Sequence, residues 1–435
     1  MSVKSAQSET GAGVAKARSR DRFEAKRDRI LDAATDLINA RGVKGTTLLE
    51  VARDVGLNTT SVTYYFRRKE LLAAAVFERS LGRLEAMVAD AAGEDGPEAR
   101  VGRLLEIHVG LRADVIRGAG RPLADFSDIR ALDDPVRLPL LAHYQRIFRQ
   151  VRAFFGAPRD AAHKDLLTAR THILFEILFT MPVWISHHPL VDFPRVRQRL
   201  LALLSHGIAL PDAGWAPAVL PGVGDAADGG EGGRANFLRV ATGLINDIGY
   251  RGASIDRIVE ELQVTKGSFY HHLDAKDDLV FDCFRLSYQR HSRIQTLAEM
   301  AGGDRWTRLS AMISALLDIQ FDGHWPLLRS SALKAVPPGL HDDVLARSNR
   351  IAMRLAGMLV DGINEGSLRP VDPLIAGQVI MTTVNAAYDL RKWALALPRD
   401  RAIAYYSASL AHGLFDDRIL DAGPVGEGAR NRPSI

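Results

Sequence analysis

Two short stretches of the sequence combine hydroxyl, aromatic and basic side chains, one near residue 60 and one near residue 268. The first reads Asn58-Thr-Thr-Ser-Val-Thr-Tyr-Tyr-Phe66, and the second reads Thr265-Lys-Gly-Ser-Phe-Tyr-His-His-Leu273. Such side chains donate and accept the hydrogen bonds that base edges and phosphates offer. The chain shows no nucleophile motif, no phosphate-binding P-loop and no metal-ligand spacing. The chemistry indicated is recognition of nucleic acid rather than catalysis.

The segments that must position these stretches are copies of each other. An offset of 207 aligns residues 30–72 with 237–279 without a gap, and 11 of the 43 positions are identical, where chance would give about three. Most substitutions between the copies keep an apolar residue. A second match, Leu204-Ser-His-Gly207 with Leu410-Ala-His-Gly413, lies at offset 206. The duplication therefore extends over about two hundred residues.

Each copy predicts a helix, a tight turn and a second short helix. Thr47 and Ser254 are good N-caps for the first short helix, and Asn58 and Thr265 are good N-caps for the second. This is the helix-turn-helix arrangement, whose second helix enters the DNA major groove. Gly56 marks the turn of the first copy. The second copy has Gln263 there, so the sequence leaves its turn geometry open.

The stretch from Val264 to Leu273, followed by Lys276-Asp-Asp-Leu279, closely resembles the TetR family of bacterial transcriptional regulators. The first copy resembles the same pattern over about 45 residues. Since each half is about as long as a whole family member, the chain resembles two TetR-type units in tandem. Thr60 and Thr63 depart from the glycine and tyrosine that the family favours there, so the first copy is expected to read different bases.

Roles follow from position on the predicted recognition helices and from the resemblance. Residues at the exposed start of each helix are expected to reach base edges, and the other polar positions match those with which the family binds phosphates. The two tyrosines of the first copy and the two histidines of the second could instead pack against the next helix. Lys69 and Lys276 could instead be exposed to solvent without binding DNA. The base-edge candidates are Thr59, Thr60, Ser61, Thr63, Lys266, Gly267, Ser268 and Tyr270; the phosphate candidates are Thr47, Tyr65, Lys69, Ser254, His272 and Lys276; Tyr64 and His271 complete the predicted DNA-binding set.

Composition narrows the fold and the setting. The remaining segments are rich in Ala and Leu and longer than strands, which predicts an all-α fold. The single cysteine, Cys283, cannot form an internal disulfide, and the first twenty residues contain no apolar segment typical of a signal peptide. We therefore expect a cytoplasmic protein without a membrane span. No two histidines are spaced four residues apart in a metal-binding pair, so no metal and no cofactor are predicted.

Charge separates the two copies. Residues 16–69 contain 13 basic and 7 acidic side chains, whereas residues 234–276 contain 6 and 5. Because phosphate neutralisation supplies most non-specific affinity, the first copy is expected to be the stronger DNA anchor.

The predicted organisation places two DNA-binding domains ahead of two helical domains. The segments are a flexible basic tail at 1–22, DNA-binding domain 1 at 23–72, effector and dimerisation domain 1 at 73–210, a linker at 211–233, DNA-binding domain 2 at 234–279, effector and dimerisation domain 2 at 280–422, and a flexible tail at 423–435.

The resemblance implies a regulator that binds a double-stranded operator, responds to a small molecule and acts as a repressor. In the family, the last two helices pair with a second subunit, so one chain could form a pseudo-dimer within itself or a homodimer with four reading heads. One alternative is that only the first helix-turn-helix binds DNA and the second half is a dimerisation or ligand module. A more distant alternative is an all-α enzyme.

Overall fold

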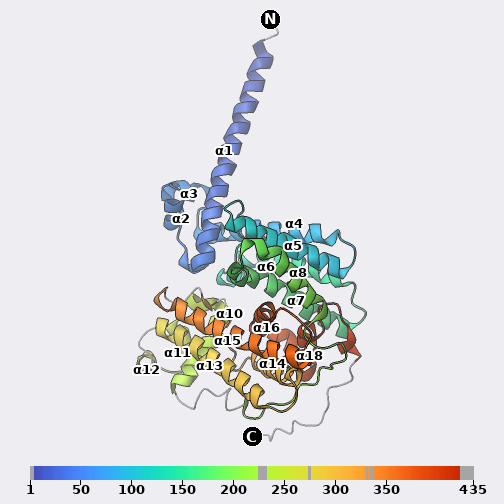
Figure 1. Cartoon of the computed structure of the whole chain (residues 1–435). Coiled ribbons are helices and arrows are strands. Elements are labelled where there is room, and N and C mark those ends of the chain that lie inside the picture. Colours follow the sequence, from blue (N-terminus) through green and yellow to red (C-terminus); the bar gives the residue numbers. More distant parts are fainter. Residues whose placement is uncertain (1–3, 224–232, 273–275, 330–331, 334–337, 422–435) are drawn as a thin grey trace. The chain divides into compact units, whose positions relative to one another are not determined.

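The computed structural model describes residues 4–223, 233–272, 276–329, 332–333 and 338–421 (Figure 1). Every regular element in these ranges is an α-helix or a short 3-10 helix, and one isolated β-bridge joins Ala209 to Leu368. The predicted all-α fold is confirmed. Packing divides the chain into two compact units: unit 1 comprises Met1–Glu85 with Arg117–Tyr144, and unit 2 comprises Ala86–Ile116 with Gln145–Ile435.

Unit 1 contains the first three-helix core. Its helices are α1 (Lys4–Arg41), α2 (Leu48–Asp54) and α3 (Thr59–Tyr65), followed by α4 (Lys69–Ala92), whose first turns belong to the same unit. Ile30, Val51 and Val62 are completely buried. Helices as short as α2 and α3 are unstable alone, so burial of this apolar face is what holds them.

Unit 2 contains the second three-helix core and the remaining helices. Its core packs Phe237 edge-to-face on Phe269, with ring centroids 5.6 Å apart. Cys283 is buried in the same core, and burial raises the pKa of its thiol to about 12, which makes the thiol unreactive. The α-helices of unit 2 are α5 (Pro97–Ile116), α7 (Ala161–Trp184), α8 (Phe193–His206), α10 (Gly233–Gly252), α11 (Ile255–Glu261), α12 (Lys266–His272), α13 (Lys276–Met300), α14 (Arg305–Asp322), α15 (Pro338–Glu365), α16 (Pro373–Ala386), α17 (Arg391–Leu395) and α18 (Arg399–Ala411), and α6 (Arg137–Arg152) crosses from unit 1 into unit 2.

Helix α7 is the central helix of unit 2. It packs against both α16 and α18, so helices from the two repeats share one core. Among the described residues, Ala161–His187 is long and apolar enough to cross a membrane, but 67% of its most apolar window is buried inside the protein. Its composition is that of a core helix, because it is covered on most sides by other helices.

Two segments expected to be flexible include a helix or buried apolar side chains. Helix α1 begins at Lys4, within the predicted tail of residues 1–22. The segment contains four alanines and five basic residues and has no proline, so a helix nucleated in the core extends backward through it.

The first part of the predicted linker is anchored by apolar side chains. Trp215 and Leu220 are buried, and Trp306 Nε1 donates a hydrogen bond of 3.0 Å to the carbonyl of Gly214. The Trp215 and Trp306 rings meet edge-on with centroids 5.9 Å apart. Residues 224–232 and the predicted tail at 423–435 lie outside the described residues.

Candidate nucleic-acid interface

The first helix-turn-helix is built from local hydrogen bonds between caps and backbone. Thr47 and Glu50 form a capping box at the start of α2: Thr47 Oγ1 accepts from the Glu50 amide at 3.2 Å, and Glu50 Oε2 accepts from the Thr47 amide at 3.0 Å. Gly56 turns the chain with φ of 68°. Asn58 Oδ1 then accepts from the Ser61 amide at 2.7 Å and starts α3. All of the caps predicted for this copy are confirmed.

The outer face of α3 presents a polar and aromatic surface. Thr60 is exposed, Tyr64 is 77% exposed, and Val62 between them is buried. Tyr65 has a packing role as well, since its ring lies 4.6 Å from that of Phe23 on α1. The other predicted contact residues of this copy are accessible in part or in full: Thr59, Ser61, Thr63 and Lys69 are half-buried, and Thr47 is exposed.

The second helix-turn-helix repeats the geometry with different residues. Ser254 Oγ accepts from the Arg257 amide at 3.2 Å, and Thr265 Oγ1 accepts from the Ser268 amide at 3.3 Å. Gln263 adopts φ of 55°, the same left-handed region as Gly56. The turn geometry is thus kept, at a cost of about 1 kcal/mol for placing a side chain there.

The outer face of α12 presents Tyr270, which is 55% exposed, and Lys266, whose Nζ lies 2.5 Å from Asp256 Oδ1 of α11. Lys276 is turned inward: its Nζ donates to the Tyr250 carbonyl at 2.7 Å and lies 4.1 Å from the centre of that ring. Gly267 and His271 are exposed and Ser268 is half-buried, whereas the side chain of His272 lies outside the described residues.

One asparagine in each copy ties the first helix of the helix-turn-helix to a distant loop. Asn39 Nδ2 donates to the Leu123 carbonyl and its Oδ1 accepts from the Asp125 amide, both at 2.9 Å. The sequence alignment shows Asn39 and Asn246 as identical but assigns them no role. The available signal was a polar residue retained within an otherwise apolar helix face.

Asn246 makes the equivalent contacts in the second copy. Its Nδ2 donates to the Leu327 carbonyl at 3.0 Å, and its Oδ1 accepts from the Arg329 amide at 2.9 Å. The Arg329 side chain forms a two-pronged ion pair with Asp389, with N–O distances of 2.6 and 2.5 Å. A continuous chain of polar contacts therefore leads from α10 to the 3-10 helix η7 (Ala387–Leu390).

A direct contact reinforces this path. Asp247, the neighbour of Asn246, accepts from Tyr388 Oη at 3.0 Å and from Arg391 Nη2 at 2.6 Å. The helices that end the second repeat are thereby attached to the first helix of its DNA-binding domain.

The ends of the two repeats meet through reciprocal hydrogen bonds. The Ile208 amide donates to the Leu410 carbonyl at 3.0 Å, and the Leu414 amide donates to the Leu204 carbonyl at 2.7 Å. Residues 206 positions apart are equivalent in this part of the two repeats, so Ile208 corresponds to Leu414 and Leu204 corresponds to Leu410. Each of the two bonds is therefore the counterpart of the other. Reciprocity of this kind is the property of a two-fold interface.

Two glycines at this seam are required by close backbone approach. Gly207 has φ of 68°, and a Cβ there would overlap the carbonyl oxygen of Ala411. Gly413 has φ of 91°, and a Cβ there would overlap the carbonyl oxygen of Ser205. Gly207 and Gly413 are equivalent at the offset of 206, and so are Ser205 and Ala411. The same close approach therefore requires the glycine that ends the Leu-x-His-Gly match in both repeats.

A buried arginine adds a charged contact to the same seam. Arg170 of α7 is 2% exposed, and its Nη1 lies 2.8 Å from Asp417 Oδ1. Burial lowers the pKa of the guanidinium, and the Asp417 carboxylate opposes that effect. Removing Asp417 would leave the buried guanidinium without its counterion, which is costly inside a protein, whereas Asp417 is also paired with Arg159.

The family model described as bacterial regulatory proteins, tetR family, matches residues 30–76 and again residues 237–283. The chain therefore carries the DNA-binding region of the TetR family twice. Proteins of the TetR family are DNA-binding transcriptional regulators with a helix-turn-helix, and the family is not enzymatic.

Two curated proteins are similar to parts of this chain. The uncharacterized HTH-type transcriptional regulator in the dhlA 5' region of Xanthobacter autotrophicus is 29% identical over 149 residues, 33% of this chain and 72% of that protein. The transposon Tn10 TetC protein of Escherichia coli is 32% identical over 101 residues, 21% of this chain and 50% of that protein.

Solved structures of TetR-family regulators also match. PfmR from Thermus thermophilus has 21% identity and a TM-score of 0.32, and covers 41% of this chain and 94% of its own. A TetR/AcrR-family regulator from Thermobifida fusca has 18% identity and a TM-score of 0.31, and covers 41% of this chain and 96% of its own.

Proposed function

We propose that this chain is a ligand-responsive repressor that acts in the cytoplasm as a pseudo-dimer within one chain. Its two helix-turn-helix domains read the two unlike half-sites of one asymmetric operator. Bound at the operator, the protein blocks transcription. The domain boundaries proposed are those expected from the sequence, with the two DNA-binding domains at 23–72 and 234–279.

The observation that carries the proposal is the reciprocal seam between the repeats. The bonds from Ile208 to Leu410 and from Leu414 to Leu204 use equivalent residues of the two repeats. A symmetric pair of subunits would use its interface in this way. Because both repeats lie on one chain, each repeat already covers the seam surface of the other. A second chain is therefore not needed to form this interface.

Two recognition helices with the same register support reading by both domains. In each, a buried apolar residue (Val62 or Phe269) lies between exposed residues of the outer face. Because the outer faces differ in nearly every residue, the half-sites are expected to differ in sequence. The proposed contacts are the residues named from the sequence: hydroxyl groups in the first copy, and Lys266, Gly267, Ser268 and Tyr270 in the second.

The proposed response to a ligand is a shift between two states. Binding among the later helices moves α4 or α13, which follow the recognition helices, and so changes the spacing of the reading heads. In the second repeat, the contacts from Asn246 through Arg329 to Asp389 supply a route for this coupling. A screen in which no small molecule alters operator affinity would remove support for this part.

The test is the mass of the purified protein, free and on a selected operator, by native mass spectrometry. One chain per duplex, with unlike half-sites in the selected sequence, is the expected result. The variant Gly413→Ala is the matched probe of the seam, because its Cβ would overlap the Ser205 carbonyl. Two chains per duplex would refute the pseudo-dimer and require four reading heads or one silent pair.

A second candidate is a regulator in which only the first helix-turn-helix reads DNA. Two contacts favour it: Lys266 is paired with Asp256, and Lys276 is turned onto Tyr250. Both ammonium groups already have partners within the protein. If Lys266→Ala with Tyr270→Ala leaves operator affinity unchanged, this candidate replaces reading by both domains.

A further inference from the structure

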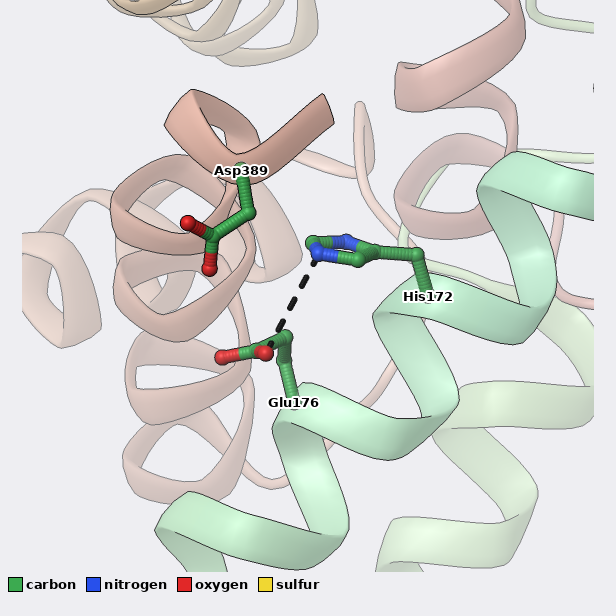
Figure 2. A group of neighbouring side chains, drawn as sticks. All are labelled: His172, Glu176 and Asp389. Carbon is green, nitrogen blue, oxygen red and sulfur yellow. Dashed lines mark ion pairs between the residues drawn. The ribbon is translucent and has the colours of Figure 1, made fainter. Parts of the chain in front are cut away.

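A histidine and two carboxylates meet where α7 of the first repeat faces η7 of the second (Figure 2). His172 and Glu176 lie one turn apart on α7, and Asp389 comes from η7. One ligand atom from each lies within 4.8 Å of the other two. A metal site is recognised in a sequence by two histidines one turn apart. This cluster has a His–Glu pair instead, and its third residue comes from the other repeat, so the sequence did not predict it.

The hydrogen bonds around Tyr406 determine which nitrogen of His172 carries the proton. Tyr406 Oη lies 3.2 Å from His172 Nδ1 and 3.2 Å from the carbonyl oxygen of Thr383. A carbonyl can only accept, so the hydroxyl donates to Thr383 and its oxygen accepts from Nδ1–H. With the proton on Nδ1, the Nε2 atom of the neutral ring carries a lone pair.

That lone pair faces the carboxylates. Nε2 lies 3.9 Å from Glu176 Oε1, beyond hydrogen-bond distance, and Figure 2 shows the Asp389 carboxylate on the same side of the ring. The three donor atoms lie within 4.8 Å of one another, and the Asp389 carboxylate is held in place by Arg329. A cation bound between the donors would gain a ligand bond from each of them.

We propose that His172, Glu176 and Asp389 bind a divalent transition-metal ion that joins the two repeats. Zinc bonds of about 2.0–2.2 Å would bring the donors to about 3.3–3.6 Å from one another, which small side-chain rotations achieve. Glu176 and Asp389 are 17% and 30% exposed, so an ion reaches them from solvent.

Residues around the three ligands hold them in place. Tyr406 orients the imidazole, and Arg329 binds both oxygens of Asp389. Partners of this kind commonly orient metal ligands and tune the bound ion. The Arg329 charge offsets one carboxylate, so the site accepts one divalent ion. One nitrogen with two oxygens suits Zn²⁺ or Co²⁺ better than Mg²⁺ or Ca²⁺, which take oxygen ligands in larger number.

A second His and carboxylate cluster in unit 1 provides a matched control. His143 Nδ1 lies 3.2 Å from Glu78 Oε1, and its Nε2 lies 2.9 Å from Glu85 Oε2. Both ring nitrogens are therefore already in hydrogen bonds. The same residue types are present, but neither ring nitrogen has a lone pair available for a metal ion.

The experiment uses full-length protein freed of metal by a chelator. ZnCl₂ is titrated by calorimetry, and CoCl₂ is titrated while visible absorption is recorded. Wild-type protein should bind one ion per chain at this site, and Glu176→Gln and Asp389→Asn should weaken binding at least about tenfold. Tyr406→Phe should weaken it about 10- to 100-fold. Glu85→Gln, the control, should bind as wild type does.

A thermal shift provides a second readout. At one fixed Zn²⁺ concentration, the rise in Tm should be as large for Glu85→Gln as for wild-type protein, and smaller for Glu176→Gln. Circular dichroism of each metal-free variant verifies that it is folded. The proposal is overturned if folded wild-type protein binds no ion saturably, or if Glu176→Gln and Asp389→Asn bind Zn²⁺ as tightly as wild type.

Discussion

The two helix-turn-helix copies keep apolar residues at their buried positions and differ on the outer face of the recognition helix. Val62 and Phe269 both fill the core beneath a recognition helix, whereas exposed Thr60 in the first copy corresponds to Gly267 in the second. The buried face is constrained by packing against the first helix, and the outer face contacts only solvent or DNA. A duplicated scaffold can therefore keep its fold while its two readers diverge.

The copies also differ in how their distal loops are held. In the first, Asp125 caps its own loop by accepting from the Ser127 amide at 2.9 Å. In the second, the equivalent loop position is Arg329, which reaches Asp389 of η7. Both loops are held by the helix that follows the recognition helix, through Ser80 in the first copy and Ser287 in the second. The second loop is in addition bound to the helices at the end of the chain. Coupling to those helices is therefore expected to be stronger in the second copy.

The largest expected contrast concerns the two asparagines. Asn246→Ala should destabilise the protein by about 3 kcal/mol, because two buried backbone groups lose their partners. Asn39→Ala should cost about half as much, since Leu123 and Asp125 are only half-buried and water can replace the amide. Urea denaturation, with hydrogen exchange to localise the loss, measures both. Equal losses would show that the two loops are held alike.

Operator binding should reveal which copy is the main anchor. Thr60→Ala with Thr63→Ala should weaken operator binding about 100-fold, through lost base contacts. Lys266→Ala with Tyr270→Ala should weaken it only about tenfold, because Lys266 is already paired with Asp256. Titration of labelled operator at matched salt gives both values. A larger loss for the second pair would reverse the assignment of anchor and weaker reader.

Acidification should affect the second copy through His291 of α13. Burial, and to a smaller extent Arg354, lowers the pKa of His291 to about 4, from 6.5. Below pH 6.5 the unfolded chain binds a proton that the folded protein does not bind until about pH 4, so stability falls as pH falls through this window. At pH 5 the loss is about 2 kcal/mol.

The first copy has Leu84 at the position equivalent to His291. His291→Leu should therefore remove this part of the pH dependence, measured by urea denaturation at pH 7 and pH 5. An unchanged difference between the two pH values would mean that His291 contributes nothing to it.

The turns provide a smaller contrast. Gln263→Gly should stabilise the protein by about 1 kcal/mol, because glycine adopts the left-handed conformation without a steric cost. Gly56→Ala should destabilise it by about 1–2 kcal/mol for the same reason. Thermal or urea unfolding of the two variants checks the opposite signs. If both variants destabilise, the Gln263 side chain makes a compensating contact.

The smallest effect concerns the ion pair on the second reading surface. Asp256→Asn should release Lys266 for DNA and raise operator affinity about two- to threefold, since an exposed pair contributes about 0.2–1 kcal/mol. Glu261→Gln changes the same net charge on the same helix and is the control. Equal effects of the two variants would attribute the gain to net charge alone.

The sequence by itself determined the helix-turn-helix units, because their signals are local. The caps at Thr47, Asn58, Ser254 and Thr265 act on amides three residues away, and the turn residues act on their own backbone. The apolar spacing identified the all-α fold for the same reason. Even the unusual turn at Gln263 could be located by alignment with Gly56, although its conformation could not.

The tertiary structure alone decided which distant groups meet. Asn39 finds partners 84 and 86 positions away, and Arg170 pairs with Asp417, 247 positions away. Local propensity carries no information about such pairs, because their distances depend on how whole helices pack. The reciprocal seam at Gly207 and Gly413 required two backbones to touch, and the His172 cluster required helices of both repeats to converge on one point.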